Sequence, residues 1–209
     1  MIQALFLGTK RPKIVILLRN PVDRAYSHYR MDQRMMQEDH IPFEEFVQRE
    51  MKLLRVEQII DFEWDQAYTI NKTYSTPTNF SLQQIDEVMD RVSDQLKGHN
   101  YLSRGLYAMQ LARWFRRGLG EDMLIIPYPE LEFHPEKVYS RVLEFAGMPS
   151  HALSQEILRE KFNFNDAITE PISTSTRQRL TTFFENSRTE LVDLLKSHNK
   201  SQEWDWHSL

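Results

Sequence analysis

A short stretch near the start of the chain, residues 13–29 (KIVILLRNPVDRAYSHY), gathers side chains that bind anions. Arg19 can donate two parallel charge-assisted hydrogen bonds, and Ser27 can add a neutral donor. Ser27 lies seven residues after Asn20. This spacing predicts that the two share one helix face with Arg24. A guanidinium and a hydroxyl that converge beside a helix N-terminus are what a phosphate monoester requires. We therefore expect a phosphate monoester to bind at Arg19 and Ser27.

Two elements must position these side chains, a strand and the helix that follows it. Lys13–Leu18 is a continuous aliphatic run without alternation, which predicts a parallel strand buried on both faces. Asn20 is a good N-cap and Pro21 suits the first helical position, so we expect a helix from Pro21 to about Met36. The junction of this strand and helix is predicted to offer backbone N–H groups and the helix dipole to an anion.

The rest of the chain alternates predicted helices with one more strand, which indicates the α/β class with a large share of helix. After a helix over residues 43–60 we expect a surface loop over 61–79 and a helix between the capping residue Ser81 and Gly98. A core helix is predicted from near Ser103 to Gly118, with Tyr107 and Trp114 on its apolar stripe. The elements expected after it are a strand Met123–Ile126, a turn through Pro127 and Pro129, a helix over 135–146, and two consecutive helices, Thr176–Glu185 and Ser187–His198.

The two predicted strands leave the sheet incomplete. Parallel strands that are buried on both faces need neighbours and covering helices, and two of them do not form a stable sheet alone. We therefore expect residues 1–209 to be the C-terminal portion of a single larger α/β domain, lacking its first strand and the loop and helix after it.

Composition narrows the function classes. The 209 residues include no cysteine, which excludes disulfides, thiolate nucleophiles and cysteine-based metal sites. The net charge of −4 disfavours nucleic acid as a partner, whereas residues 1–36 hold seven Lys or Arg against two Asp, which favours a small anion. The histidines lack metal-ligand spacing, so we expect no metal site. No apolar run approaches the length of a membrane span.

The run from Lys13 to Tyr29 resembles the 3′-phosphate-binding motif of the sulfotransferases that use 3′-phosphoadenosine 5′-phosphosulfate (PAPS), particularly the carbohydrate branch related to heparan sulfate sulfotransferases. In that family a strand ends in Arg, followed by Asn or Asp, Pro, two residues, Arg, and a Ser shortly before Tyr. Residues 105–115 (GLYAMQLARWF), the helix from Pro135 to Gly147 and the terminal Trp204–Trp206 are similar to later family motifs. The resemblance covers about residues 10–206.

This resemblance implies a P-loop-like parallel sheet flanked by helices. It also implies an enzyme that transfers a sulfuryl group from PAPS, without a metal, to an acceptor hydroxyl or amine, most simply on a glycan. Arg19 and Ser27 match the pair that binds the 3′-phosphate of the cofactor in this family.

The sequence departs from the family pattern in three places. It contains no phosphosulfate-binding loop of the Lys-x-Gly-Thr-Thr type, no Lys-Glu motif with the catalytic base, and no basic loop at Asp166–Ser175. We therefore assign no catalytic residue and expect this chain to be inactive. Two alternatives stay open: a non-catalytic module that keeps the phosphate half-site, and a helical interaction protein in which Arg19 and Ser27 point apart or into solvent.

Overall fold

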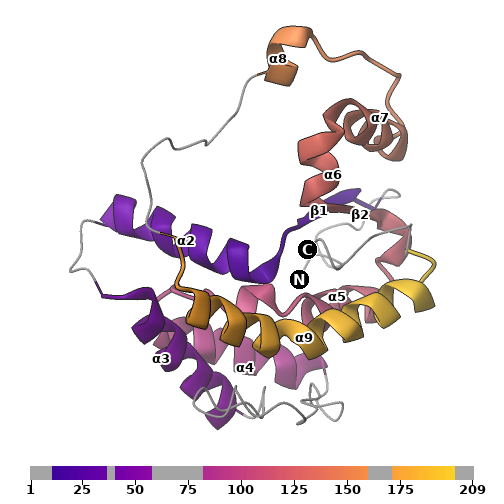
Figure 1. The fold of residues 1–209 in the computed structure, drawn as a ribbon. Helices are drawn as coiled ribbons and strands as arrows, with labels where there is room; N and C mark the ends of the chain where they lie inside the picture. Colours follow the sequence, from indigo (N-terminus) through magenta and orange to yellow (C-terminus); the bar gives the residue numbers. More distant parts are fainter. Residues whose placement is uncertain (1–10, 37–40, 58–81, 160–170, 201–209) are drawn as a thin grey trace. The chain divides into compact units, whose positions relative to one another are not determined.

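The computed structural model describes residues 11–36, 41–57, 82–159 and 171–200 (Figure 1). The chain divides into two compact units. The sheet unit comprises residues 1–19, 114–169 and 207–209, and the helical unit comprises residues 20–113 and 170–206. The predicted loop over 61–79, the capping residue Ser81 and Trp204–Trp206 lie outside the described residues.

The sheet unit is built on two parallel strands. β1 (Ile14–Leu18) and β2 (Met123–Pro127) pair in register, with Ile14 opposite Met123 and Leu18 opposite Pro127. β1 starts one residue later than predicted, and β2 ends one residue later. The two predicted parallel strands are therefore confirmed, and so is the α/β class.

Short helices follow β2 in the sheet unit. These are α6 (Tyr128–Phe133), α7 (Pro135–Ala146) and α8 (Gln155–Arg159), with the 3₁₀ turn η3 (Gly120–Asp122) before the strand. α7 ends as predicted, because Gly147 adopts the left-handed conformation with φ of 69°. The predicted turn through Pro127 and Pro129 is wrong. Pro129 instead lies in the first turn of α6, where its missing N–H costs no hydrogen bond.

One face of β1 is exposed, contrary to the prediction that this strand is buried on both faces. Val15 is 42% exposed and Leu17 is 49% exposed, whereas Leu18 at the end of the strand is buried. Side chains alternate along a strand, so Val15 and Leu17 share one face. Among the described residues only β2 pairs with β1. The aliphatic run thus predicted the strand correctly but not its surroundings.

The helical unit is an assembly of α-helices around one apolar core. It contains α2 (Pro21–Met36), α3 (Phe43–Val56), α4 (Leu82–Gln95), the 3₁₀ turn η2 (Ser103–Gly105), most of α5 (Tyr107–Arg116), and α9 (Thr174–Ser197). α2 contacts α9, and α3 contacts α4 (Figure 1). α2 also contacts η2. The core takes Val22, Ala25, Val47, Leu54, Val92, Leu180 and Phe184 from these elements. No described helix is long and apolar enough to cross a membrane.

α9 is one continuous helix, so the predicted break between Glu185 and Ser187 is wrong. The hydroxyl of Ser173 caps its start and accepts a hydrogen bond from the Thr176 backbone N–H over 3.2 Å. Ser187 is buried in the middle of the helix. No Gly or Pro interrupts residues 174–197, and the buried stripe continues across the expected break.

Two helix boundaries also differ from the prediction. α3 ends at Val56 and not at residue 60, and α5 begins at Tyr107 and not near Ser103, because Ser103 belongs to the η2 turn. Tyr107 and Trp114 are half-buried, while Leu111 between them is fully buried. The core role predicted for the α5 stripe therefore holds for Leu111 and only in part for the two large aromatic residues.

The exposed face of β1 predicts self-association of the chain. Replacing Val15 and Leu17 with Thr should lower light scattering of the purified protein, because an exposed apolar strand face favours contact between molecules. The free energy of unfolding should change by less than about 1 kcal/mol per site, since both side chains are already half exposed. As a matched control, Ile125→Thr on the buried β2 should lower stability much more. Scattering that is unchanged in the double variant contradicts the prediction.

Candidate functional site

Arg19, the first predicted site residue, follows β1 directly and belongs to the sheet unit. Its guanidinium carbon lies 5.2 Å from the centroid of the Tyr128 ring, which is a cation–π distance. Tyr128 follows β2 directly, and Leu18 and Pro127 are paired, so both side chains leave the same edge of the sheet. Ligands of parallel sheets bind at this carboxyl edge. The sequence analysis missed Tyr128, although its place directly after the second strand was a usable signal.

The N-terminus of α2 differs from the prediction in one respect. The Oδ1 atom of Asn20 accepts hydrogen bonds from the backbone N–H groups of Val22, over 2.9 Å, and Asp23, over 3.2 Å. The N–H of Arg24 donates to the Asn20 carbonyl, and Pro21 has no N–H. The first-turn donors are therefore already used, and the expectation that they are offered to an anion is wrong. An anion here would be bound by side chains and by the helix dipole.

Ser27 is exposed on the second turn of α2, in the helical unit. Asp23, one turn earlier, would repel an anion, but its carboxylate is paired with Arg177 of α9 over 2.8 Å. This ion pair compensates the negative charge close to Ser27. Ser27 and Arg19 belong to different units, and their convergence on one phosphate stays a prediction.

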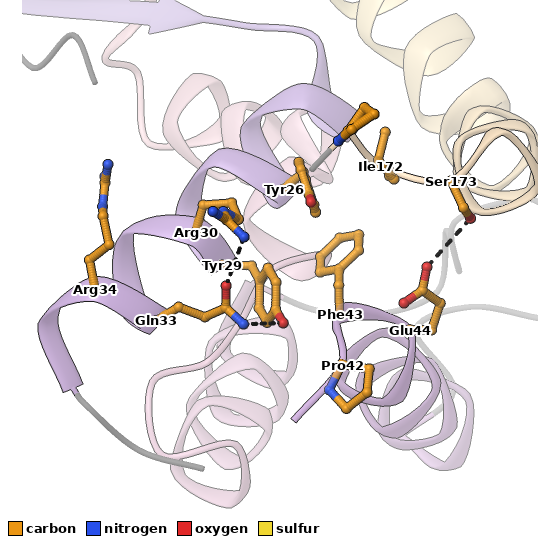
Figure 2. A pocket seen from close by; sticks show the side chains of 11 residues that line it. Tyr26, Tyr29, Arg30, Gln33, Arg34, Pro42, Phe43, Glu44, Ile172 and Ser173 are labelled. Carbon is orange, nitrogen blue, oxygen red and sulfur yellow. Dashed lines mark hydrogen bonds between the residues drawn. The ribbon is translucent and has the colours of Figure 1, made fainter. Parts of the chain in front are cut away.

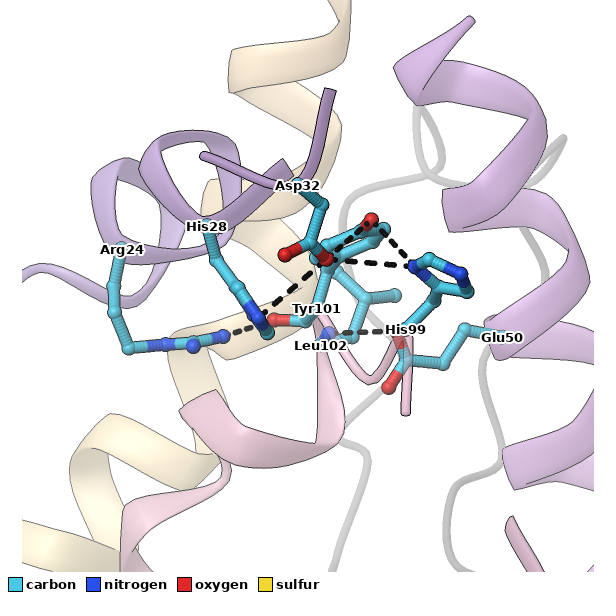
Figure 3. Close-up of polar contacts among 7 residues, drawn as sticks. All are labelled: Arg24, His28, Asp32, Glu50, His99, Tyr101 and Leu102. Carbon is cyan, nitrogen blue, oxygen red and sulfur yellow. Dashed lines mark hydrogen bonds and ion pairs between the residues drawn. The ribbon is translucent and has the colours of Figure 1, made fainter. Parts of the chain in front are cut away.

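Arg24 forms a structural contact within the helical unit, whereas its spacing had suggested a place on the anion-binding face of α2. Its guanidinium donates a hydrogen bond to the backbone carbonyl of Tyr101 (Figure 3). The Tyr101 hydroxyl in turn donates to Asp32 of α2 over 3.0 Å, and His99 Nδ1 lies 3.1 Å from the same hydroxyl. His28 Nε2 lies 3.6 Å from the Asp32 carboxylate, one turn away on α2. These contacts fasten α2 to the segment before η2.

Burial shifts the pKa values of His28 and Tyr101 in this cluster. It lowers the pKa of His28, an effect that the nearby Asp32 carboxylate opposes. Burial, followed by the hydrogen bond to Asp32, raises the pKa of Tyr101 well above its ordinary value. Tyr101 therefore remains a hydrogen-bond donor at every physiological pH. Across the residues that the structure describes, no group of three or more His, Asp or Glu is arranged to hold a metal ion.

Glu50 of α3 anchors the next residues of the same segment. It is fully buried, and its carboxylate accepts three hydrogen bonds of 2.7 Å. Figure 3 shows the bond from the Leu102 backbone N–H. The other two come from the backbone N–H and the hydroxyl of Ser103. Three donors satisfy a carboxylate that burial would otherwise penalise. The η2 turn is thereby fixed against α3.

Gly105, the last residue of η2, allows this turn to approach α2 closely. A Cβ atom at this position would lie 2.8 Å from the Phe184 ring and 3.0 Å from Pro21. The distance to the buried Phe184 ring is too short for a side chain and the distance to Pro21 is at the limit, so glycine is favoured by space and not by its backbone conformation. Glu50 and Gly105 together position η2 against the N-terminal turn of α2, which carries Asn20.

Glu50 predicts a specific dependence of stability on pH. Burial raises the pKa of Glu50 above the ordinary Glu value of 4.5, although its hydrogen bonds to Ser103 and Leu102 oppose the shift. The folded state therefore holds the proton more tightly than the unfolded state, and this contribution to stability is lost as the pH rises from about 4.5 through the folded pKa.

The Glu50→Gln variant has no titrating group at this position, so its stability should lack this pH-dependent contribution. The advantage of the native protein over the variant in free energy of unfolding should be largest below about pH 4.5 and shrink as the pH rises. The variant should lose about 1–3 kcal/mol at low pH, because its NH2 group cannot accept a hydrogen bond, whereas the hydroxyl oxygen of the protonated carboxyl still can. Urea unfolding between pH 4 and 8 measures the difference. An advantage that grows with pH contradicts the raised pKa.

Comparisons with known proteins extend these observations. A family model described as a sulfotransferase domain matches residues 3–193. The crystal structure of a sulfotransferase from Alicyclobacillus acidocaldarius is similar at 21% sequence identity and a TM-score of 0.53, and the match covers 88% of this chain. It covers 54% of that chain, so this sequence spans about half the length of the solved protein. The likeness confirms the predicted helix-rich α/β fold. No curated protein matches the sequence.

Proposed function

We propose that this chain, which belongs to the sulfotransferase domain family, takes part in the transfer of a sulfuryl group from PAPS to a hydroxyl or amine of a carbohydrate acceptor. The family match supports sulfuryl transfer in general. The observation that supports the choice of donor is Arg19, which leaves the carboxyl edge of the parallel sheet with its guanidinium over the Tyr128 ring.

The chain's own residues would bind and orient the donor. The Arg19 guanidinium lies over the Tyr128 ring. It would donate two hydrogen bonds to the 3′-phosphate, and the Ser27 hydroxyl would donate a third. Holding the nucleotide by this phosphate fixes the position of the leaving group, which lowers the entropic part of the barrier. In the transfer itself the acceptor oxygen or nitrogen would form a bond to sulfur and lose its proton to a base. The bond from sulfur to the 5′-phosphate oxygen would break, and adenosine 3′,5′-bisphosphate would leave.

Adenosine 3′,5′-bisphosphate, the product of the donor, provides the direct test of this site. Arg19→Ala should weaken its binding by roughly 1.5 to 3 kcal/mol, because a bidentate charged contact is lost. Ser27→Ala should weaken it by about 0.5 to 1.5 kcal/mol, the range for a neutral hydrogen bond. Isothermal titration calorimetry measures both changes.

Arg49→Ala is the matched control for this titration, because Arg49 is an exposed arginine of α3 paired with Glu45. Its affinity should equal that of the native chain. Unchanged affinity in Arg19→Ala, with binding otherwise intact, excludes the proposed phosphate site.

Transfer by the 209-residue chain is expected to be undetectable. Neither a Lys-x-Gly-Thr-Thr sequence nor a Lys-Glu pair occurs in its 209 residues, so the expected donors to the phosphosulfate and the expected base are missing. An assay with radiolabelled PAPS and a panel of glycans measures this, with an active sulfotransferase as the positive control. Robust transfer of label by the purified chain contradicts the expectation and would place the base among the residues present here.

A further inference from the structure

One carboxylate oxygen of α2 collects several of the contacts that join this helix to residues 99–102. Asp32 Oδ2 accepts a hydrogen bond from the Tyr101 hydroxyl over 3.0 Å. The same oxygen lies 3.4 Å from His99 Nδ1 and 3.6 Å from His28 Nε2 (Figure 3). Asp32 is buried, and the side chains of His28 and His99 are only 12% and 17% exposed. Two titratable rings therefore share one buried acceptor within the helical unit.

The hydrogen bonds determine where the two histidines carry their protons. Tyr101 has a single hydroxyl proton, which it donates to Asp32. His99 Nδ1 lies 3.1 Å from the Tyr101 hydroxyl oxygen, so His99 must supply an N–H of its own there. His28 Nε2 faces the Asp32 carboxylate, which places the proton of the neutral ring on Nε2. The Nδ1 atom of His28 is then a bare acceptor. It is buried and has no hydrogen-bond partner in the part of the chain that the structure describes.

Protonation of His28 places a new N–H at this buried Nδ1 atom. A buried donor without an acceptor costs free energy. The added charge is opposed by Arg24, Arg104 and His99, which lie close to the ring. The Asp32 carboxylate favours it. Burial is the largest of these effects, and it lowers the pKa of His28 below the ordinary value of 6.5. The contact with residues 99–102 is therefore made by a neutral His28.

The opposite side of α2 leaves room for the helix to move. A cavity of about 540 Å³ lies beside Tyr26, Arg30 and Arg34 (Figure 2). Successive residues of a helix are rotated by about 100°, so these three positions lie opposite His28 and Asp32. A close-packed neighbour would resist a turn of the helix, whereas a cavity does not. Once the contact with residues 99–102 is lost, α2 can turn toward this space.

We propose that His28 is a positioning residue for α2, and that acid releases this helix from residues 99–102 by protonating His28 at Nδ1. In the released state the charged ring reaches water, and Asp32 separates from Tyr101. Ser27, the neighbour of His28 in the chain, is the residue proposed above to contact the 3′-phosphate. Release therefore also weakens the nucleotide site, a step that rests on the proposed function.

The dependence on pH has a defined sign. Burial lowers the pKa of His28 only while the contact is made, so the released state takes up the proton more readily. The contact is fully stabilised above about pH 6.5 and loses this stabilisation as the pH falls below it. Glu50 of α3, which bonds to Leu102 and Ser103, acts with the opposite sign, because its pKa is raised. A comparison of the native chain with a variant at His28 isolates the histidine.

Hydrogen exchange of the α2 backbone amides in the full 209-residue chain tests the release. His28→Gln keeps an N–H that can reach Asp32 but does not titrate. Between about pH 7.5 and 5.5 the protection factors of α2 should fall by about three- to tenfold more in the native chain than in this variant. His151→Gln is the matched control, because His151 is exposed in the sheet unit, and it should respond as the native chain does. An equal response of the native chain and His28→Gln overturns the proposal.

Nuclear magnetic resonance provides a second measurement that needs only the native chain. The ring proton resonances of His28 and His151 report the pH at which each ring titrates. The midpoint for His28 should lie below that for His151, and the α2 amide resonances should shift with the His28 midpoint. A His28 midpoint at or above that of His151 overturns the proposal, even if His28→Gln fails to fold.

Adenosine 3′,5′-bisphosphate separates this proposal from the proposed function. A phosphate monoester itself takes up a proton at about pH 6, so the native chain and His28→Gln are compared at the same pH. Acid should weaken binding by up to about tenfold more in the native chain, because only the unreleased state binds. Release that depends on His28, in a chain that binds no nucleotide, supports this proposal and overturns the function. Nucleotide binding that depends on Arg19, with equal exchange in both chains, overturns this proposal and leaves the function intact.

Discussion

The buried carboxylate of Glu50 joins parts of the helical unit that are far apart in the sequence. Its three hydrogen bonds fix Leu102 and Ser103 against α3. This placement brings Gly105 against Pro21, at the first turn of α2. A buried carboxylate that lost these donors would be strongly destabilising, so the contact is made in full or the segment moves. The first turn of α2, one turn before the proposed phosphate-binding Ser27, therefore depends on a residue of another helix.

Residue types at helix ends correctly predicted the helix ends that a capping residue determines. Asn20 caps α2 and Gly147 ends α7, as their residue types require. The prediction failed where a local signal was weaker than packing. Ser187 and Glu190 have the spacing of a capping box, but Ser187 is buried within α9, because the apolar stripe of this helix runs without interruption.

The sequence predicted only the part of the candidate site that lies on one strand and the helix after it. Arg19 and Ser27 follow from the strand, the cap and the helical spacing around them. Tyr128, which lies under the Arg19 guanidinium, comes from a segment more than a hundred residues later and is brought there by the pairing of β1 and β2. Asp32 has a helical neighbour in His28, a spacing visible in the sequence, yet its bond to Tyr101 is visible only in three dimensions.

Ser27 lies on α2, and a helix can present a side chain in a fixed direction only when its rotation is fixed. Packing alone permits a helix to turn slightly, because apolar contacts have little directional preference. α2 buries Ala25 in the core and, on an adjacent line, bonds Asp32 to the Tyr101 hydroxyl. A hydrogen bond is directional, so the Asp32 contact fixes the rotation that the core leaves loose. Ser27 on the other side is then held at one orientation. The polar cluster does not include Ser27, yet it determines the direction in which this side chain leaves α2.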